Sequence, residues 1–351
     1  MKQDAKFPAF INIALGIIVI FLVNWILVIG RPIILPFFVA IFLAFILDPL
    51  VNLLTKIKFP RSLAVLITII ISFVILYLLG LLVYANIQGF VQQYPAYEEK
   101  LIILLRNTVD TIEHLIGQQI NVNIWQKIDW LDTIQNMSIA SNVVSGVGTF
   151  FSFFVKMLIV IVFMAYILVG KQNLRSKIFK AFSGHQAHRI DDIINAATEK
   201  IQKYLGTKIL VSFITALISF IIFIIFGIDF AVFWSVVIFV FNFIPNIGSI
   251  LASILPVVFS ILQFGSFSTA LWLLFALSIL QFLMGNILEP RLMGYSLDLS
   301  PLAVILSLIF WGYLWGVAGM LLSVPILATA TIIFERIESL KFISVFLRGK
   351  V

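Results

Sequence analysis

The sequence predicts an all-α, polytopic integral membrane protein with about eight transmembrane helices, and three observations predict it. Hydrophobic residues make up 62% of the 351 residues and charged residues only 11%, whereas a soluble domain is about half apolar and about a quarter charged. Apolar stretches of about 20 residues, long enough to cross the bilayer as a helix, recur along the chain. Stretches such as ITIIISFVILYLLGLLVY lack the alternation of a transmembrane strand, so helices and not a barrel are expected.

Residues 1–85 are predicted to hold transmembrane helices 1 to 3, at about 10–29, 33–54 and 62–85. Arg31 and Pro32 form a tight connection between the first two. The first helix lacks a small-residue cleavage site and leads directly into further apolar stretches. We therefore interpret it as an uncleaved span and not as a signal peptide.

Residues 86–146 are predicted to be an extracytoplasmic amphipathic segment. They contain three basic and six acidic residues, and a basic deficit is typical of the outer side of a membrane. Within them, LIILLRNTVDTIEHLIGQQI places apolar residues at helical spacing beside charged ones. The pattern predicts amphipathic helices on the bilayer surface or on the protein itself.

Residues 147–351 are predicted to hold transmembrane helices 4 to 8. The fourth covers about 148–169 and the fifth about 208–228, on either side of a basic cytoplasmic loop at 171–207. Eight basic and three acidic residues fall within 171–208. By the positive-inside rule this segment lies in the cytoplasm, where it would contact anionic membrane lipid.

The last third, residues 230–334, is the predicted transport core. Its apolar stretches 230–262 and 301–334 contain prolines and glycines, and each would be about 50 Å long as one helix, against a hydrocarbon core of about 30 Å. Each must tilt, break or re-enter, and the sequence leaves these choices open. Between them, 269–288 is a simpler span, while Gly312 and Gly316 form a GxxxG pattern typical of helix packing.

An even number of spans places both termini on the same side, and the basic residues near each end predict that this side is cytoplasmic. The expected location is a bacterial inner (cell) membrane.

Glu289 and Arg291 flank Pro290 in the sequence GNILEPRLMG. Proline cannot continue the helical hydrogen-bond ladder and disfavours helical geometry at the preceding residue, so the helix is expected to end or break at Glu289. Asn286 precedes this acid by three residues. The group could bind a cation or a proton, or it could lock two helices through an ion pair.

The second candidate is FNFIPNIGS. Pro245 removes a donor from the helical ladder, while Asn242, Asn246 and Gly248 offer polar groups and close backbone approach. The alternative is a kinked helix whose asparagines bond to neighbouring helices.

Four further ionisable residues lie in or near predicted spans, and each has a structural alternative. Asp48 could simply approach the cytoplasmic interface near Lys56, and Lys156 could extend to the membrane surface. Asp229 is expected in a turn or helix cap. Asp298, with Ser300 before Pro301, is expected to cap a helix.

Several absences limit the chemistry. The chain has no cysteine, no GxxxxGK[ST] loop and no HExxH motif, so we expect neither an enzyme, a cofactor nor a metal site. No soluble basic face is visible, so no nucleic-acid partner is expected.

The C-terminal third resembles the autoinducer-2 exporter-like permease family in FIPNIGSILASILPVVFSIL and in GNILEPRLMGYSLDLSPLAVILSLIFWGYLWGVAGMLLSVPILA. The resemblance implies a carrier of about eight spans, homo-oligomeric, linked either to export of autoinducer-2 or to sodium/proton exchange. The positions that match the family pattern are Pro245, Gly248, Asn286, Glu289, Pro290 and Arg291.

The leading hypothesis is a secondary-active permease that moves a small polar solute, autoinducer-2 being one candidate, coupled to protons or sodium. Glu289 would bind the coupling cation, and Arg291 would balance it or contact the solute. The alternatives are a sodium/proton antiporter without an organic substrate and a non-transporting membrane scaffold.

Overall fold

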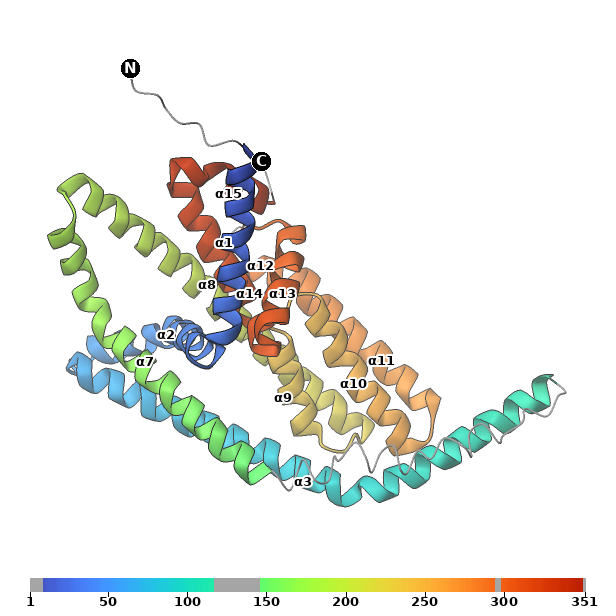
Figure 1. Cartoon of the computed structure of the whole chain (residues 1–351). Coiled ribbons are helices and arrows are strands. Elements are labelled where there is room, and N and C mark those ends of the chain that lie inside the picture. The colour runs from blue at the N-terminus through green and yellow to red at the C-terminus, as the bar shows by residue number, and fades with distance from the viewer. Residues whose placement is uncertain (1–8, 117–145, 294–297, 350–351) are drawn as a thin grey trace. The chain divides into compact units, whose positions relative to one another are not determined.

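The computed structural model describes residues 9–116, 146–293 and 298–349, and within these ranges the chain is helical with no strand (Figure 1). The chain divides into two compact units that alternate along the sequence. Unit 1 comprises Met1–Val65, Lys156–Ile201 and Asp298–Val351, and unit 2 comprises Leu66–Val155 and Gln202–Leu297.

The helices have the length and composition of membrane spans, which confirms the predicted fold class. Among the described residues, six helices are long and apolar enough to cross a bilayer: Arg31–Lys56, Arg61–Phe90, Gly184–Phe226, Ile247–Phe264, Phe267–Met293 and Val317–Arg336. A seventh is added if Val155–Lys171 and Asn173–Ala181, bent by 63°, form one span. The count of eight stays a prediction.

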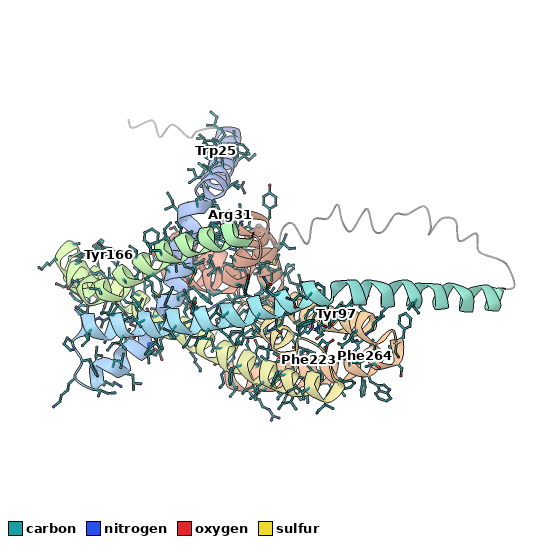
Figure 2. All side chains as sticks on the ribbon, turned by 90° about the horizontal axis from the view of Figure 1, so that it is seen from below. Trp25, Arg31, Tyr97, Tyr166, Phe223 and Phe264 are labelled. Atoms are coloured by element: carbon teal, nitrogen blue, oxygen red, sulfur yellow. The ribbon has the colours of Figure 1, made fainter. Side chains whose placement is uncertain are left out.

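Large side chains stand out along the helices, as expected of a surface that faces lipid (Figure 2). Trp25 is 55% exposed and Tyr166 is 77% exposed. An apolar surface of this extent would be unfavourable in water.

Unit 1 is built from α1 (Ala9–Ile29), α2 (Arg31–Lys56), α13 (Pro301–Trp315), α14 (Val317–Arg336) and α15 (Lys341–Leu347), with parts of the longer helices α3, α7 and α8. Gly30 alone separates α1 from α2; Arg31 and Pro32, predicted to form the connection, are instead in the first turn of α2, where proline needs no amide hydrogen. Trp315 is fully buried among apolar side chains of α1, α2 and α14. Its indole nitrogen Nε1 donates a hydrogen bond of 3.2 Å to the carbonyl of Leu27, which ties α13 to α1.

The long C-terminal apolar stretch breaks at Gly316, which has a φ of 65° and separates α13 from α14. The interpretation of Gly312 and Gly316 as one packing motif is therefore only half right. A Cβ added at Gly312 would lie 3.0 Å from the Met320 side chain of α14, so this glycine does permit close approach. Gly316 instead makes a turn, because its positive φ favours glycine.

Unit 2 is built from α9 (Ala231–Phe241), α10 (Ile247–Phe264), α11 (Phe267–Phe282), a π-helical turn η1 (Leu283–Leu288) and α12 (Glu289–Met293), with the remaining parts of α3, α7 and α8. Figure 1 shows α10 and α11 side by side. Their shared core includes Phe223, Phe259 and Leu273, each less than 5% exposed.

The two predicted segments between spans, 86–146 and 171–207, are more helical in their described residues than expected. The third span and the described part of the amphipathic segment form one helix, α3 (Arg61–Ile116), while residues 117–145 of that segment lie outside the described residues. The predicted basic loop at 171–207 consists of the end of α7 (Gly146–Ala181) and the start of α8 (Gly184–Phe226). Long charged side chains are good helix formers, so a basic segment between two spans can continue them as helix.

Candidate functional site

The first candidate region is the break between α9 and α10 in unit 2. Asn246 has a φ of 57°, and Gly248 is buried in the first turn of α10. A Cβ on Gly248 would lie 1.8 Å from the carbonyl oxygen of Phe241, so only glycine fits there. The break predicted from Pro245 is thus present, and its physical causes are the missing amide hydrogen and this close contact.

The two asparagines of the break have different surroundings. Asn242 is 7% exposed, whereas Asn246 is exposed. A buried amide needs hydrogen-bonding partners, because burial without them costs free energy. Of the two asparagines, only Asn242 is enclosed by the protein at the break.

The second candidate region surrounds Glu289, where the predicted helix end is wrong. The π turn η1 passes directly into α12, which continues as helix through Met293. The amide of Glu289 bonds to the carbonyl of Met284, five residues earlier, and Glu289 has helical φ and ψ of −58° and −50°. A π turn widens the helix by one residue per turn, which accommodates Pro290 without ending the helix. Asn286 lies within η1 and is exposed.

Glu289 is paired with Lys208 of α8 and not with Arg291. The Lys208 Nζ lies 2.6 Å from Glu289 Oε1 and donates a hydrogen bond to it. The side chain of Lys208 is 7% exposed and that of Glu289 is 22% exposed. Arg291 is exposed and forms no ion pair within the described part of the chain.

Lys208 begins a polar stripe on α8 that sequence reasoning missed. Lys208, Ser212, Thr215 and Ser219 follow a helical spacing that places them on one face, and all four are buried. Thr215 Oγ1 donates to the carbonyl of Val211 at 2.7 Å. The hydroxyls of Ser212 and Ser219 have no hydrogen-bond partner among the described residues. The spacing of four, three and four residues between these polar residues, within an apolar run, could have indicated the stripe.

Asp229 lies just after the C-terminal end of α8, in a group of hydrogen bonds that holds α3 to this turn. Tyr97 of α3 donates its hydroxyl to Asp229 Oδ2 at 2.8 Å, and the Asp229 amide donates to Gln263 Oε1 at 2.9 Å. Burial, and secondly the hydrogen bond to Asp229, raise the pKa of Tyr97. Lys100 of α3 donates to the Gln263 carbonyl at 2.8 Å. The prediction of a turn at Asp229 is confirmed, but the group clamps α3 to the turn and does not cap α9.

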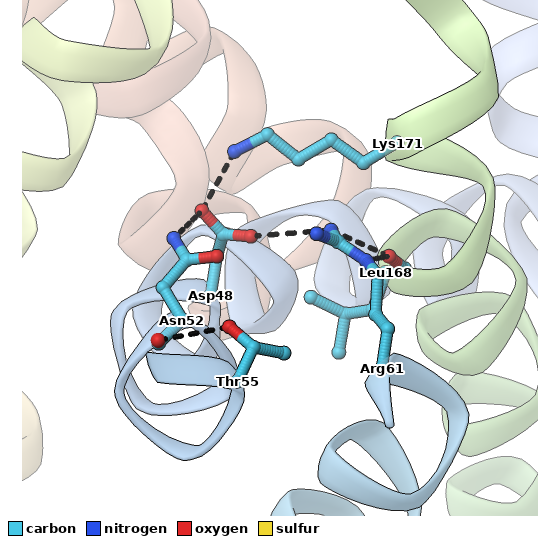
Figure 3. Close-up of polar contacts among 6 residues, drawn as sticks. All are labelled: Asp48, Asn52, Thr55, Arg61, Leu168 and Lys171. Atoms are coloured by element: carbon cyan, nitrogen blue, oxygen red, sulfur yellow. Dashed lines mark hydrogen bonds and ion pairs between the residues drawn. The ribbon is translucent and has the colours of Figure 1, made fainter. Parts of the chain in front are cut away.

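Asp48 lies in unit 1, and its approach to the cytoplasmic interface near Lys56 stays a prediction. Its carboxylate is almost fully buried and accepts a hydrogen bond of 2.6 Å from Lys171 of α7 (Figure 3). Arg61 lies 3.9 Å away at the start of α3, and Asn52 Nδ2 donates at 3.2 Å. The sequence did not reveal this pair because its members are 123 residues apart.

The other two ionisable residues have simpler surroundings. Lys156 is exposed on α7, as a side chain that extends to the membrane surface would be. Ser300 occupies the N-cap position of α13 ahead of Pro301, but makes no side-chain capping bond. Instead, its amide bonds to the carbonyl of Leu347, and the Asp298 carbonyl accepts from Gly349.

No group of three or more His, Cys, Asp or Glu side chains that could hold a metal ion occurs among the residues that the structure describes.

Comparison with known proteins adds a family likeness. A family model described as AI-2E family transporter matches residues 15–339. The AI-2 transport protein TqsA of Escherichia coli is 33% identical over 271 residues, which cover 76% of each chain. A putative transport protein of Haemophilus influenzae is 31% identical over 257 residues, or 72% of each chain. A putative transport protein of Borreliella burgdorferi is 39% identical over 198 residues, which cover 56% of this chain and 55% of the relative.

Proposed function

Since the chain belongs to the AI-2E transporter family, we propose that it is a secondary-active permease that moves a small polar solute, coupled to protons or sodium ions. Autoinducer-2 is the first candidate solute, because the Escherichia coli relative is named an AI-2 transport protein. The observation that carries the proposal is the ion pair between Lys208 and Glu289, next to a π turn in an apolar helix.

The Lys208–Glu289 pair has the chemistry of a cation-exchange site. Ionisable groups in a membrane helix are costly, and those that occur are typical of ion pathways. An ammonium held by a carboxylate at 2.6 Å occupies the place that a proton or Na⁺ would take. Pro290 has no amide to donate to the preceding turn, so a backbone carbonyl of the π turn lacks its helical donor near Glu289 and would serve as an oxygen ligand for Na⁺.

The polar stripe on α8 supplies the second part of the proposal. Ser212 and Ser219 have buried hydroxyls without a partner among the described residues, and a buried hydroxyl without a partner costs free energy. A solute rich in hydroxyl or carbonyl groups would satisfy them. Asn242 at the α9–α10 break and the exposed Arg291 are further candidate contacts, consistent with broken helices that line a cavity.

The proposed location is a bacterial inner membrane with both termini in the cytoplasm, and the proposed assembly is a homo-oligomer. The support for the orientation is the positive-inside rule applied to the eight basic residues of 171–208 and to those near both ends.

The test is a proteoliposome assay with an enclosed pH-sensitive dye, in which a sodium gradient and then autoinducer-2 are imposed. Wild type is compared with Glu289→Gln, which keeps the size of the side chain but removes its charge. Glu338→Gln is the matched control, because Glu338 is exposed outside the membrane helices. We expect coupled flux in wild type and in the control, and at least a tenfold loss in Glu289→Gln, equivalent to about 1.4 kcal/mol.

The same assay separates the alternatives. A sodium-driven proton flux without any organic solute would assign a sodium/proton antiporter, for which the Lys208–Glu289 pair is equally suited. A flux that requires autoinducer-2 would assign the exporter. Full activity in Glu289→Gln would refute the role of Glu289, and no flux under any condition would favour a scaffold.

A further inference from the structure

The environment of Glu289 recurs elsewhere in the chain. Residues 287–290 read Ile-Leu-Glu-Pro, and residues 46–49 read Ile-Leu-Asp-Pro. In both places an acid stands directly before a proline within an apolar helix. Such acids are rare in membrane helices because their charge is costly there, and where they occur they are typical of functional sites.

The two acids also have the same kind of partner. Each accepts a hydrogen bond of 2.6 Å from a lysine of another helix, Lys208 in unit 2 and Lys171 in unit 1. In both helices the proline has no amide to donate to the preceding turn, which leaves a backbone oxygen near the acid. In α2, the carbonyl four residues before Pro49 belongs to Phe45, which, like Asp48, lines a pocket in unit 1.

Of the two cations near Asp48, Lys171 is the one that can leave. Arg61 is held by two hydrogen bonds, of 3.0 and 3.3 Å, to the carbonyl of Leu168, and its guanidinium stays 3.9 Å from the acid. The side chain of Lys171 is 42% exposed, against 3% for Asp48. Lys171 can therefore exchange its carboxylate partner for water at little cost, whereas Asp48 needs a replacement cation.

A pocket beside Asp48 in unit 1 offers space for that cation. Asp48 and Lys171 both line a pocket of about 330 Å³, together with Tyr166 of α7 and Thr198 of α8. The pocket is large enough for several water molecules. Among the charged and titratable groups that face Asp48 in the described chain are Lys171, Arg61 and, across the pocket, Tyr166.

We infer that Asp48 is a second site for a monovalent cation, H⁺ or Na⁺, in which Lys171 is the internal cation that the ligand displaces. The inference rests on the proposed function for its physiological meaning, because a second site sets the number of cations moved per cycle. Its geometry stands in unit 1 alone, and it can be tested independently of Glu289.

The experiment measures the release of Lys171 directly. The protein is reconstituted in phosphatidylcholine nanodiscs, acylated briefly with an amine reagent, and digested. Mass spectrometry then gives the labelling rate of Lys171 relative to Lys177, which is exposed on the same helix and corrects for the effect of pH on the reagent. One series replaces choline by Na⁺ at constant pH and ionic strength, and a second lowers the pH in choline.

We expect Na⁺ or acid to raise the ratio of the Lys171 labelling rate to the Lys177 labelling rate by about tenfold. This figure corresponds to a shift of Lys171 from about a tenth released from Asp48 to almost fully released. In Asp48→Asn the ratio of labelling rates should be high and should change neither with Na⁺ nor with pH. In Glu289→Gln the response of Lys171 should persist, so failure of the Glu289 assignment is distinguishable from failure of this one. A wild-type ratio that responds to neither cation, or an equal response in Asp48→Asn, overturns the inference.

A second variant keeps the test decisive if Asp48→Asn does not fold. Lys171→Gln removes the internal competitor and leaves Asp48 with Asn52 and Arg61. Stabilisation by Na⁺ or by acid, measured as the rise in melting temperature, should then be larger than in wild type. An equal or smaller rise overturns the inference.

Discussion

Replacing Lys208 by methionine tests whether the pair with Glu289 is held by electrostatics or by packing. Methionine keeps most of the length and apolar volume of the lysine stem but removes the ammonium. The carboxylate of Glu289 then loses the donor that lies 2.6 Å away. Breaking a buried ion pair on one side costs about 3–5 kcal/mol.

The exposure of the two side chains adjusts this magnitude. Lys208 is 7% exposed but Glu289 is 22% exposed, so the protein does not fully enclose the carboxylate that loses its partner. We therefore expect a loss near the lower end, about 3 kcal/mol. The double variant Lys208→Met/Glu289→Gln has no charge left to solvate. It should recover most of this loss, because neutral replacements of a buried pair are close to neutral in stability.

The assay is reversible unfolding in mixed micelles with increasing sodium dodecyl sulfate, on wild type, both single variants and the double variant. The quantity that decides is the coupling energy of the double-mutant cycle, which we expect to exceed about 1 kcal/mol. If the effects of the two single changes add to within about 0.5 kcal/mol, the residues do not interact energetically and the reasoning is refuted.

Two further predictions concern stability. Tyr97→Phe removes the donor to Asp229 and should lower the free energy of unfolding by about 1–3 kcal/mol. Because the pKa of Tyr97 is raised on folding, this difference from wild type should be fully present below about pH 10 and shrink above it. Equal stability of the two proteins at pH 7 would contradict the clamp. Gly248→Ala would place a Cβ 1.8 Å from the Phe241 carbonyl oxygen and should lower the free energy of unfolding by about 3 kcal/mol or more. The control is Gly206→Ala, whose Cβ would have nothing within 4 Å and which should be neutral or stabilising by about 0.5–1 kcal/mol. Similar melting temperatures for the two alanine variants would show that the break is not constrained by Gly248.

The sequence by itself determined the fold class, the membrane environment and the position of the first break. These follow from local properties: apolar length, the missing amide of Pro245 and the absence of catalytic motifs. The family resemblance in the C-terminal third was likewise readable from the order of residues, and the match over residues 15–339 confirms it.

Only the tertiary structure decided which charges meet. The sequence suggested Arg291, two residues away, as the charge that balances Glu289. In the structure Glu289 pairs instead with Lys208, which is 81 residues away in the sequence. Residues two apart on a helix point in different directions, so the side chains of Glu289 and Arg291 do not face each other although they are close in sequence. Asp48 likewise pairs with Lys171 across 123 residues. A buried charge must find an opposite charge wherever the packing of helices places one, and that placement is a property of the fold and not of any local segment.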